Sequence, residues 1–516
     1  MPNRSTDALF QLIHSLQKSE KRNFKLYIKR NSANEDLKIV QLFDALDKMS
    51  EYDEATLLKK IPAIKKQQLS NIKAHLYRQL LASLRLLESG ANIDIQLREQ
   101  LDYARILYNK GLYIQSLRVL DKIKEVARTH NQVSLLVQVL SLEKNIESLH
   151  ITRSLADRAT QLSAEANEVA ERLVLVTRLS NLALQLYGWY IKNGHARNQE
   201  DEELLTQFFR QQLPCEISPS HTFYQKLYYY QSYCWYAFIR QDFLMYYRYT
   251  QKWVDLFYQQ PLMIEVETAH YIKGMHNLLN AHFTLQNFQK FDDTLCQFEQ
   301  FAASDTVKGN DNNTIQVFVY LYIAKINQHF MHGSFKEGLK LVPELEEKLA
   351  TYALHLDRHR VLVFYYKIAS LYFGSGDYDT TIDYLNKIIN WKVDLRNDLQ
   401  CYARLLHLIA HYELGNFDLL EYLTRSVYRF MAKMQNLSYV EEEIFQFLRQ
   451  SFHLTARQLK PAFEHLLHKL KSLEKNRFEV RAFAYLDIVS WLESKVHNIP
   501  LEQVFQKKFL ANHKRI

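Results

Sequence analysis

The chain contains little of the two residues that build turns and loops. Glycine occurs 11 times and proline 8 times in 516 residues, whereas average proteins contain about 7% and 5% of them. Sheets and long irregular loops need such residues in quantity. Their scarcity predicts an all-α fold of long helices joined by tight connections.

Cysteines and long apolar runs are also scarce. The four cysteines show no C-x-x-C spacing, which favours a reducing compartment over disulfides or a zinc site. No segment approaches the roughly 18 apolar residues that a membrane helix needs. The first residues also lack the basic-then-apolar pattern of a signal peptide. We therefore expect a cytoplasmic protein with no membrane association.

Familiar catalytic motifs are missing as well. The sequence contains no G-x-x-x-x-G-K-[ST], G-x-G-x-x-G, H-E-x-x-H or G-x-S-x-G pattern, so it offers no phosphate loop, zinc-protease helix or nucleophile elbow. We expect a protein that is not an enzyme and that needs no cofactor.

What the sequence does contain is a repeated six-residue pattern: an aromatic residue, two variable residues, Gly or Gln, one more residue, and a second aromatic. The six copies are Tyr108–Tyr113, Phe238–Phe243, Phe283–Phe288, Phe330–Phe335, Phe373–Tyr378 and Tyr412–Phe417. A looser copy, Tyr190–His195, has Asn193 at the Gly/Gln position. Copies start 39 to 48 residues apart, except for one gap of 82. Such a period is typical of a helical solenoid.

The clearest copy predicts a helix-turn-helix unit. Residues up to Phe373 end a first helix, Gly376 supplies the turn, and Asp377 can cap a second helix. In the unit at Tyr113, apolar or small residues follow at offsets of three, seven and ten, which share one helix face. Each second helix therefore presents a packing seam to its neighbours.

These units resemble the tetratricopeptide-repeat family over roughly residues 97 to 430. The best matches to its small and aromatic positions are Ala369, Tyr372, Gly376, Asp377, Tyr378 and Thr381, followed by Ala104, Gly111, Tyr113 and Ser116. The resemblance implies a right-handed superhelical solenoid. The spacing exceeds the 34 residues of the family, which implies longer helices or loops.

The sequence predicts three parts: residues 1–90, 91–435 and 436–516. The first part reads as a small domain of five helices and carries +6 of the net charge of +8. The second is the solenoid, with a further turn expected near Arg153 and Ser154. The third reads as degenerate capping helices, with a break before Pro461.

By this resemblance, the leading functional hypothesis is a protein–protein interaction scaffold that binds a peptide or protein segment in a concave groove. Residues 222–258 are the most aromatic stretch, and three consecutive tyrosines there cannot all face one core. They either anchor a partner or pack against the next unit. The candidate partner-binding residues are Tyr228, Tyr229, Tyr366, Ser370, Phe373, Phe283, Phe330 and Tyr412.

The alternative hypothesis is a regulator whose N-terminal domain binds nucleic acid while the solenoid senses a partner. Basic side chains could contact phosphates and release counterions, although Lys and Arg also occupy any solvated helix face. The candidates are Lys59, Lys60, Lys65, Lys66, Lys73, Arg78 and Arg85.

Histidine pairs at helical spacing raise the question of a metal site. His355/His359 and His407/His411 are four residues apart, and His465/His468 are three apart. However, His282, His329 and His411 each lie six residues before the second aromatic of a repeat, where another unit has Tyr372. A position shared by His and Tyr favours packing with one polar contact, and we expect no metal site.

Overall fold

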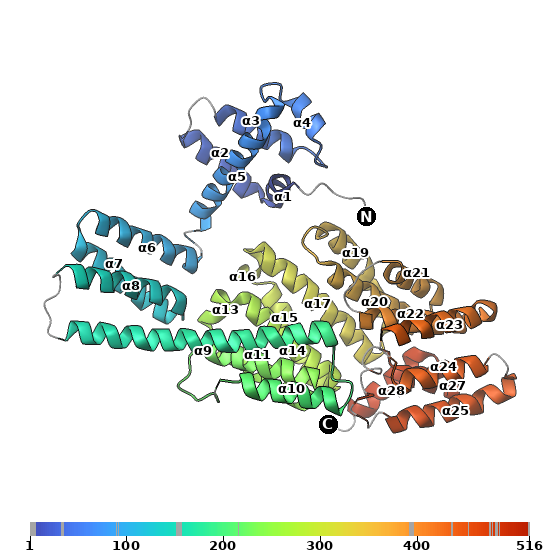
Figure 1. Ribbon diagram of the computed structural model, residues 1–516. Helices are drawn as coiled ribbons and strands as arrows, with labels where there is room; N and C mark the ends of the chain where they lie inside the picture. Colours follow the sequence, from blue (N-terminus) through green and yellow to red (C-terminus); the bar gives the residue numbers. More distant parts are fainter. Residues whose placement is uncertain are drawn as a thin grey trace. The chain divides into compact units, whose positions relative to one another are not determined.

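The computed structural model describes residues 7–31, 36–88, 90, 92–150, 157–214, 216–391, 397–434, 437–451, 454–473, 476, 478, 479, 483 and 486–513. Every regular element within these residues is a helix, so the all-α class is confirmed for this part of the chain. The chain forms two compact units, residues 1–170 and 171–516 (Figure 1). The division into three parts stays a prediction.

The first unit begins with the five predicted helices, packed around a core that includes Phe24, Phe43 and Leu76. They are α1 (Ala8–Ser15), α2 (Lys18–Asn31), α3 (Asp36–Asp47), α4 (Glu54–Lys60) and α5 (Lys66–Glu88). Local capping sets two of the starts, because Asp7 accepts a hydrogen bond from the backbone of α1 and Asp53 accepts two from α4.

Three stacked helices follow in the same unit (Figure 1). These are α6 (Ile93–Asn109), α7 (Tyr113–Thr129) and α8 (Val133–Leu149). The corner between α7 and α8 places Asn131 at a φ of 55°, and the aromatic pattern did not reveal it. The turn expected near Arg153 and Ser154 lies outside the described residues. The 36-residue helix α9 (Arg158–Asn193) continues the chain into the second unit.

The second unit consists mainly of helix pairs. Its helices up to the last repeat are α10 (Gln199–Gln212), α11 (Phe223–Ile239), α12 (Phe243–Gln259), α13 (Leu262–Val266), α14 (Thr268–Thr284), α15 (Phe288–Ala302), α16 (Asp305–Lys308), α17 (Asp311–His332), α18 (Phe335–Gly338), η1 (Leu339–Leu341), α19 (Val342–Thr351), α20 (Arg358–Ser375), α21 (Tyr378–Ile389), α22 (Asn397–Glu413) and α23 (Phe417–Lys433). Each repeated aromatic segment here joins two of these helices.

The Gly or Gln of each repeated segment takes a left-handed backbone conformation. The φ angles are 76° at Gly111, 60° at Gln241, 55° at Gln286, 63° at Gly333, 89° at Gly376 and 72° at Gly415. The aromatic residues on either side of the turn meet at the corner, with ring centroids 5.4 Å apart for Phe373–Tyr378 and 5.8 Å apart for Tyr108–Tyr113. The six segments are therefore helix corners.

The looser seventh copy turns one residue later than its alignment suggested. Helix α9 ends at Asn193, and the left-handed residue is Gly194, with a φ of 72°. A glycine adopts this conformation without the steric cost that a β-carbon brings. The turn therefore follows the glycine rather than the strict spacing of the other copies.

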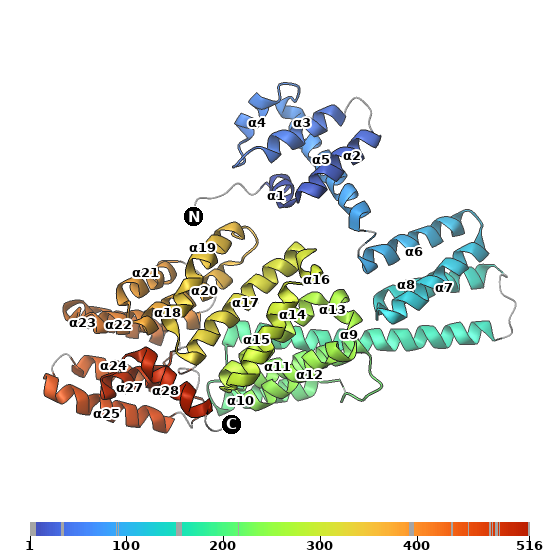
Figure 2. The same cartoon turned by 180° about the vertical axis from the view of Figure 1, so that it is seen from behind.

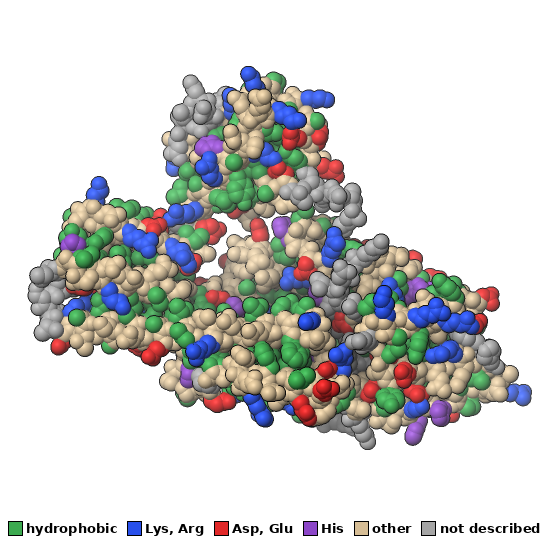
Figure 3. Space-filling view, viewed as in Figure 1, with side chains coloured by type: hydrophobic (Ala, Val, Ile, Leu, Met, Phe, Trp, Pro, Cys, Tyr) green, Lys and Arg blue, Asp and Glu red, His purple; other side chains and the backbone are tan. Residues whose placement is uncertain are grey.

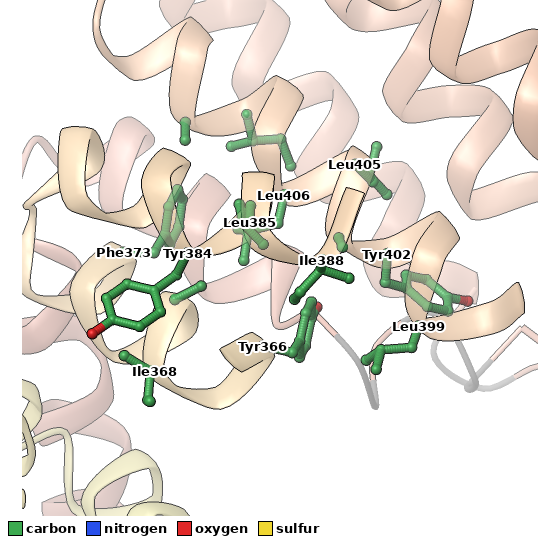
Figure 4. Close-up of a cluster of buried hydrophobic side chains, with 14 of the residues drawn as sticks. Tyr366, Ile368, Phe373, Tyr384, Leu385, Ile388, Leu399, Tyr402, Leu405 and Leu406 are labelled. Atoms are coloured by element: carbon green, nitrogen blue, oxygen red, sulfur yellow. The ribbon is translucent and has the colours of Figure 1, made fainter. Parts of the chain in front are cut away.

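Small residues let the paired helices approach closely. Ser116 on α7 donates a hydrogen bond to the carbonyl of Ala104 on α6, and Thr381 on α21 donates to that of Ala369 on α20. All four residues are fully buried. Figure 4 shows the core beside the second of these contacts, where side chains of α20, α21 and α22 interdigitate. The labelled residues are Tyr366, Ile368, Phe373, Tyr384, Leu385, Ile388, Leu399, Tyr402, Leu405 and Leu406.

Four described helices follow the last repeat: α24 (Tyr439–Ser451), α25 (Ala456–Leu473), α27 (Ile488–His497) and α28 (Leu501–His513). Helix α25 runs through Pro461 instead of beginning after it. Figure 2 shows these helices against the repeats. In particular, α28 packs on repeat corners, because Phe505 contacts Phe335 and Phe509 contacts Phe288.

We predict that alanine has different costs at two left-handed glycines. A β-carbon at Gly376 meets nothing within 4 Å, whereas at Gly333 it would lie 2.6 Å from the backbone nitrogen of Gln506 in α28. Gly376→Ala should lower the free energy of unfolding by about 1 kcal/mol. Gly333→Ala should lower it by roughly 2 to 4 kcal/mol, because overpacking adds to the backbone cost.

Urea unfolding of the full chain measures both effects. Gln286→Gly, at the same corner position of another repeat, is the control and should not destabilise the fold. Equal losses for the two alanine variants would contradict the packing of α28 against Gly333.

Candidate functional site

The candidate site lies on the face that three successive first helices share in the second unit. Helix α14 packs against α17, and α17 packs against α20. Residues spaced three, four and seven apart on each helix point to the same side. We call this surface the first-helix face. Its members are Lys273, His276 and Phe283 of α14, Tyr320, Asn327 and Phe330 of α17, and Arg360 and Lys367 of α20.

The ring of Tyr320 is the centre of one group of contacts on this face. The imidazole of His276 stacks on it, with ring centroids 4.3 Å apart and planes at 23°. The ammonium of Lys273 lies 4.9 Å from the ring centroid, and the guanidinium of Arg360 lies 5.9 Å from it. Cations at these distances are attracted to the electron-rich ring face. Tyr320 therefore gathers two cations and an imidazole from the flanking helices.

Lys367 forms the adjoining group of contacts. Its Nζ donates a hydrogen bond of 2.6 Å to Oδ1 of Asn327, which is buried. The same ammonium lies 6.0 Å from the ring centroid of Phe283 and 5.6 Å from that of Phe330. Asn327 thus holds the lysine between two aromatic rings that belong to two different repeats.

The electrostatics of the face are those of a cationic site with few acids. Among the described residues, no carboxylate forms an ion pair with Lys273 or Lys367. Arg360 pairs with the mostly exposed Asp357, at 3.3 Å, in the first turn of its own helix. Burial lowers the pKa of Lys367 to about 8. Burial, then the charges of Lys273, Lys367 and Arg360, lowers the pKa of His276 well below its ordinary value.

Helix α11 borders this face with a less basic group. Tyr228 packs edge-on against His270 at 5.9 Å, and His270 contacts the carboxylate of Glu267 at 2.8 Å. Tyr224 donates a hydrogen bond of 2.5 Å to Glu267. Two tyrosine rings and the carboxylate of Glu267, which is contacted by Tyr224 and His270, thus border the cations of the first-helix face.

Five of the eight predicted partner-binding residues are partly exposed, and three are buried. Phe283, Phe330 and Tyr228 are half-buried, the first two on the first-helix face and Tyr228 beside it. Ser370 is half-buried and donates its hydroxyl to the carbonyl of Tyr366. Tyr412 packs against Phe447, Phe463 and Trp491 of the C-terminal helices. The side chains of Tyr229, Tyr366 and Phe373 are only 4%, 7% and 4% exposed.

The consecutive tyrosines of α11 divide between two neighbours. Tyr228 faces α14, whereas Tyr229 and Tyr230 face Tyr249 of α12, with ring centroids 6.3 Å and 6.2 Å apart. Tyr229 also donates a hydrogen bond to Glu216. Much of the aromatic stretch is therefore interhelical packing.

The predicted basic residues of the N-terminal helices differ in accessibility. Lys73 is held by an ion pair with Asp7 and a hydrogen bond of 2.9 Å to the hydroxyl of Tyr52. Arg85 lies 3.5 Å from Asp102. The side chains of Lys59, Lys60, Lys65, Lys66 and Arg78 are exposed. On the face drawn in Figure 3, basic and acidic side chains are interspersed over this part of the chain.

Two of the three repeat histidines make local polar contacts, whereas Nδ1 of the buried His282 has no hydrogen-bond partner among the described residues. Nδ1 of His329 lies 2.9 Å from Oγ of Ser334, and Nδ1 of His411 lies 3.0 Å from Nδ2 of Asn416. Both partners sit next to the left-handed residue of the corner. Within the described ranges, no group of three or more His, Cys, Asp or Glu side chains is arranged to hold a metal ion.

A polar hollow of about 450 Å³ lies elsewhere, along α10. Its one residue outside α10, Arg240, directly follows α11 and makes a 2.8 Å hydrogen bond to Glu202, so the cation is neutralised within the wall. This hollow contains no aromatic side chain. It is a weaker candidate than the first-helix face, where Lys273 and Lys367 have no paired carboxylate among the described residues.

Sequence reasoning missed the cations of the site, although a signal was present. Lys273 and Tyr320 each lie 15 residues before the second aromatic of their corner, and Phe283 and Phe330 each lie five before it. Extending the repeat register backwards along the first helices would have aligned them. Lys367 has no counterpart of the same type in the neighbouring repeats, so only the fold brings it to Asn327.

A scan against known protein-family models finds no match for this chain. A search of curated proteins finds no significant relative either. None of the described helices combines the length and the apolar character needed to cross a membrane.

We predict that Lys367 makes stability rise with pH in the alkaline range. In the unfolded chain its ammonium keeps a proton up to about pH 10.5, whereas the folded pKa is about 8. The unfolded state therefore binds more protons between these values, and stability increases with pH. From pH 8 to pH 10, wild type should gain about 2 kcal/mol relative to Lys367→Met.

Denaturant unfolding of both proteins across this pH range is the measurement, and other titrating groups cancel in the difference. Parallel curves for the two proteins would show that the pKa of Lys367 is not lowered.

Proposed function

We propose that the second unit is a non-enzymatic scaffold that binds a peptide or protein segment along the first-helix face. We further propose that its repeats are tetratricopeptide-like and stack in a right-handed superhelix. The observation that carries the proposal is the convergence of half-buried rings and three cations from three successive helices on one face. Stacked repeats present such extended surfaces to partners.

The aromatic residues support binding because they remain partly accessible. Phe283, Tyr320 and Phe330 are half-buried, although each packs in a well-ordered helix pair. Partly exposed rings supply large contact areas with little loss of side-chain freedom on binding. A partner lying across α14 and α17 would bury the remaining area of all three.

The charges support an acidic segment as the partner. The charges of Lys273, Arg360 and Lys367 all act on His276, and among the described residues only Asp357 forms an ion pair with one of them. Complementary charge favours encounter and fixes the register of a bound chain. We therefore propose that the bound segment carries acidic side chains opposite these cations.

The polar groups of the site favour binding over catalysis. The hydroxyl of Ser370, on the same helix as Lys367, is occupied by the carbonyl of Tyr366. His276 is stacked on Tyr320 and surrounded by cations, which oppose the imidazolium that a general base forms. The thiols of Cys234 and Cys401 are buried and form no disulfide, which supports a reducing, cytoplasmic location.

The scaffold is tested with peptides selected from a random library on the full-length protein. We expect acidic sequences to be enriched. Phe283→Ala and Phe330→Ala should each weaken their binding about tenfold, because an anchor ring contributes roughly 1 to 2 kcal/mol. Fluorescence anisotropy of a labelled selected peptide measures the affinity.

Tyr439→Ala is the matched control, because Tyr439 is a 67% exposed aromatic residue on α24. It should leave the affinity unchanged. Selected peptides that bind equally well to all four proteins would place their site elsewhere and contradict the proposal.

A second candidate function, nucleic-acid binding by the N-terminal helices, is favoured by the exposed lysines at the end of α4 and the start of α5. We propose it as the alternative. Changing Lys59, Lys60, Lys65 and Lys66 together to Glu in the full chain should abolish binding to duplex DNA and RNA. Wild-type affinity should fall steeply with salt, because each phosphate contact releases counterions. Lys325→Glu, in the second unit, is the control.

Electrophoretic mobility shifts across a salt series provide the measurement. Absence of binding at low salt, or an affinity that does not change with salt, would remove this alternative.

A further inference from the structure

Two of the three successive first helices, α14 and α20, contribute to one group of cationic side chains. Lys273 comes from α14, and Arg360 and Lys367 come from α20, with Tyr320 and Asn327 of α17 between them. The contacts to Tyr320 and Asn327 hold the cations on the same side of the helix layer. All three charges lie close enough to lower the pKa of His276. The four nitrogen-bearing groups therefore surround a common region.

Two other partly buried cations of the second unit are paired with carboxylates. Arg240 is paired with Glu202, and Lys495 is paired with Glu413. Lys367, by contrast, has an amide oxygen and two rings as its neighbours, and no paired carboxylate among the described residues. Gathering like charges without counter-charges costs free energy. Groups whose pKa is strongly perturbed by burial and neighbouring charge are candidates for functional sites.

We propose that Lys273, His276, Arg360 and Lys367 form a binding site for the phosphoryl group of a phosphate monoester. This inference rests on the proposed scaffold, because the phosphoryl group would belong to the segment that lies along the first-helix face. Phe283 and Phe330 would contact the apolar part of the same ligand, next to Lys367.

The chemistry of the site fits a phosphate monoester better than a carboxylate. A monoester carries a charge of about −1.5 to −2 near neutral pH and has three strong acceptor oxygens. Three cations exceed what a singly charged carboxylate can neutralise. The guanidinium of Arg360 offers paired donors for two oxygens, and the lysines supply point charges for the rest. A neutral His276 can add one N–H donor.

Proton uptake gives a signature that a merely structural cluster would not produce. A bound dianion stabilises the charged form of Lys367, whose pKa is about 8 without it. Binding at pH 8 therefore takes up a fraction of a proton. Calorimetry in two buffers with different ionisation enthalpies measures this uptake directly.

The experiment uses the full-length protein and isothermal titration with O-phosphoserine, phenyl phosphate and inorganic phosphate. Acetate, serine and sulfate are the comparison ligands. We expect the monoesters to bind with proton uptake at pH 8. Lys367→Met and Arg360→Gln should each weaken that binding at least tenfold. Lys325→Met is the matched control, because Lys325 lies on α17 but pairs with Glu299 at 2.9 Å.

A phosphoserine peptide separates the two sources of the phosphoryl group. A selected first-helix-face peptide carrying phosphoserine should bind at least tenfold tighter than its serine form. If only the free monoesters bind, and do so through Lys367, the site stands as a small-molecule phosphate site and the scaffold fails. If peptides bind the face but wild type and Lys367→Met bind monoesters equally or not at all, the phosphoryl site is wrong and the scaffold stands.

Circular dichroism and urea midpoints show that each variant is folded. Lys273→Ala serves as a further variant that does not disturb the hydrogen bond to Asn327, and it should weaken monoester binding about fivefold. Unchanged monoester affinity in all three variants would overturn the site.

Discussion

A single left-handed residue at the end of each first helix is the constraint on which the repeat stack depends. It reverses the chain within two or three residues, so the second helix returns directly along the first. Glycine occupies the left-handed position at four corners. At the other two, Gln241 and Gln286 adopt this conformation despite the steric cost of a β-carbon. The rings that flank the turn, as in Phe373 and Tyr378, contact each other at four of the six corners.

Because that demand is local, the sequence predicts the corners well. The aromatic pattern located six of them, and five helices were predicted for the N-terminal part. The pattern failed where the corner lacks rings, as at Asn131, and where Gly194 moved the turn by one residue. Contacts between residues far apart in the sequence could not be predicted in this way, because no local pattern places Lys367 beside Asn327 or Tyr229 beside Glu216.

The same corners explain why the C-terminal helices belong to the stack. Helix α28 places Phe505 and Phe509 on the second aromatic residues of two corners and leaves no room for a β-carbon at Gly333. Helix α27 adds a hydrogen bond from Trp491 to Glu413 of α22, the first helix of the last repeat. The C-terminal residues thus cover the ring-bearing edge of the array, while the first-helix face keeps its rings and cations partly accessible.

The corners and the first-helix face also differ in how they surround charged side chains, and this difference bears on function. Away from the first-helix face, the partly buried Lys495 is paired with Glu413 at contact distance. On the first-helix face the fold supplies tyrosine, phenylalanine and asparagine instead, which hold the cations in place without neutralising them. Burying a charge that has no counter-charge lowers stability. The lowered pKa of Lys367 reflects this, because burial disfavours its charged form. An anion from outside the chain would remove this cost, which is why the site favours a ligand over a purely structural role.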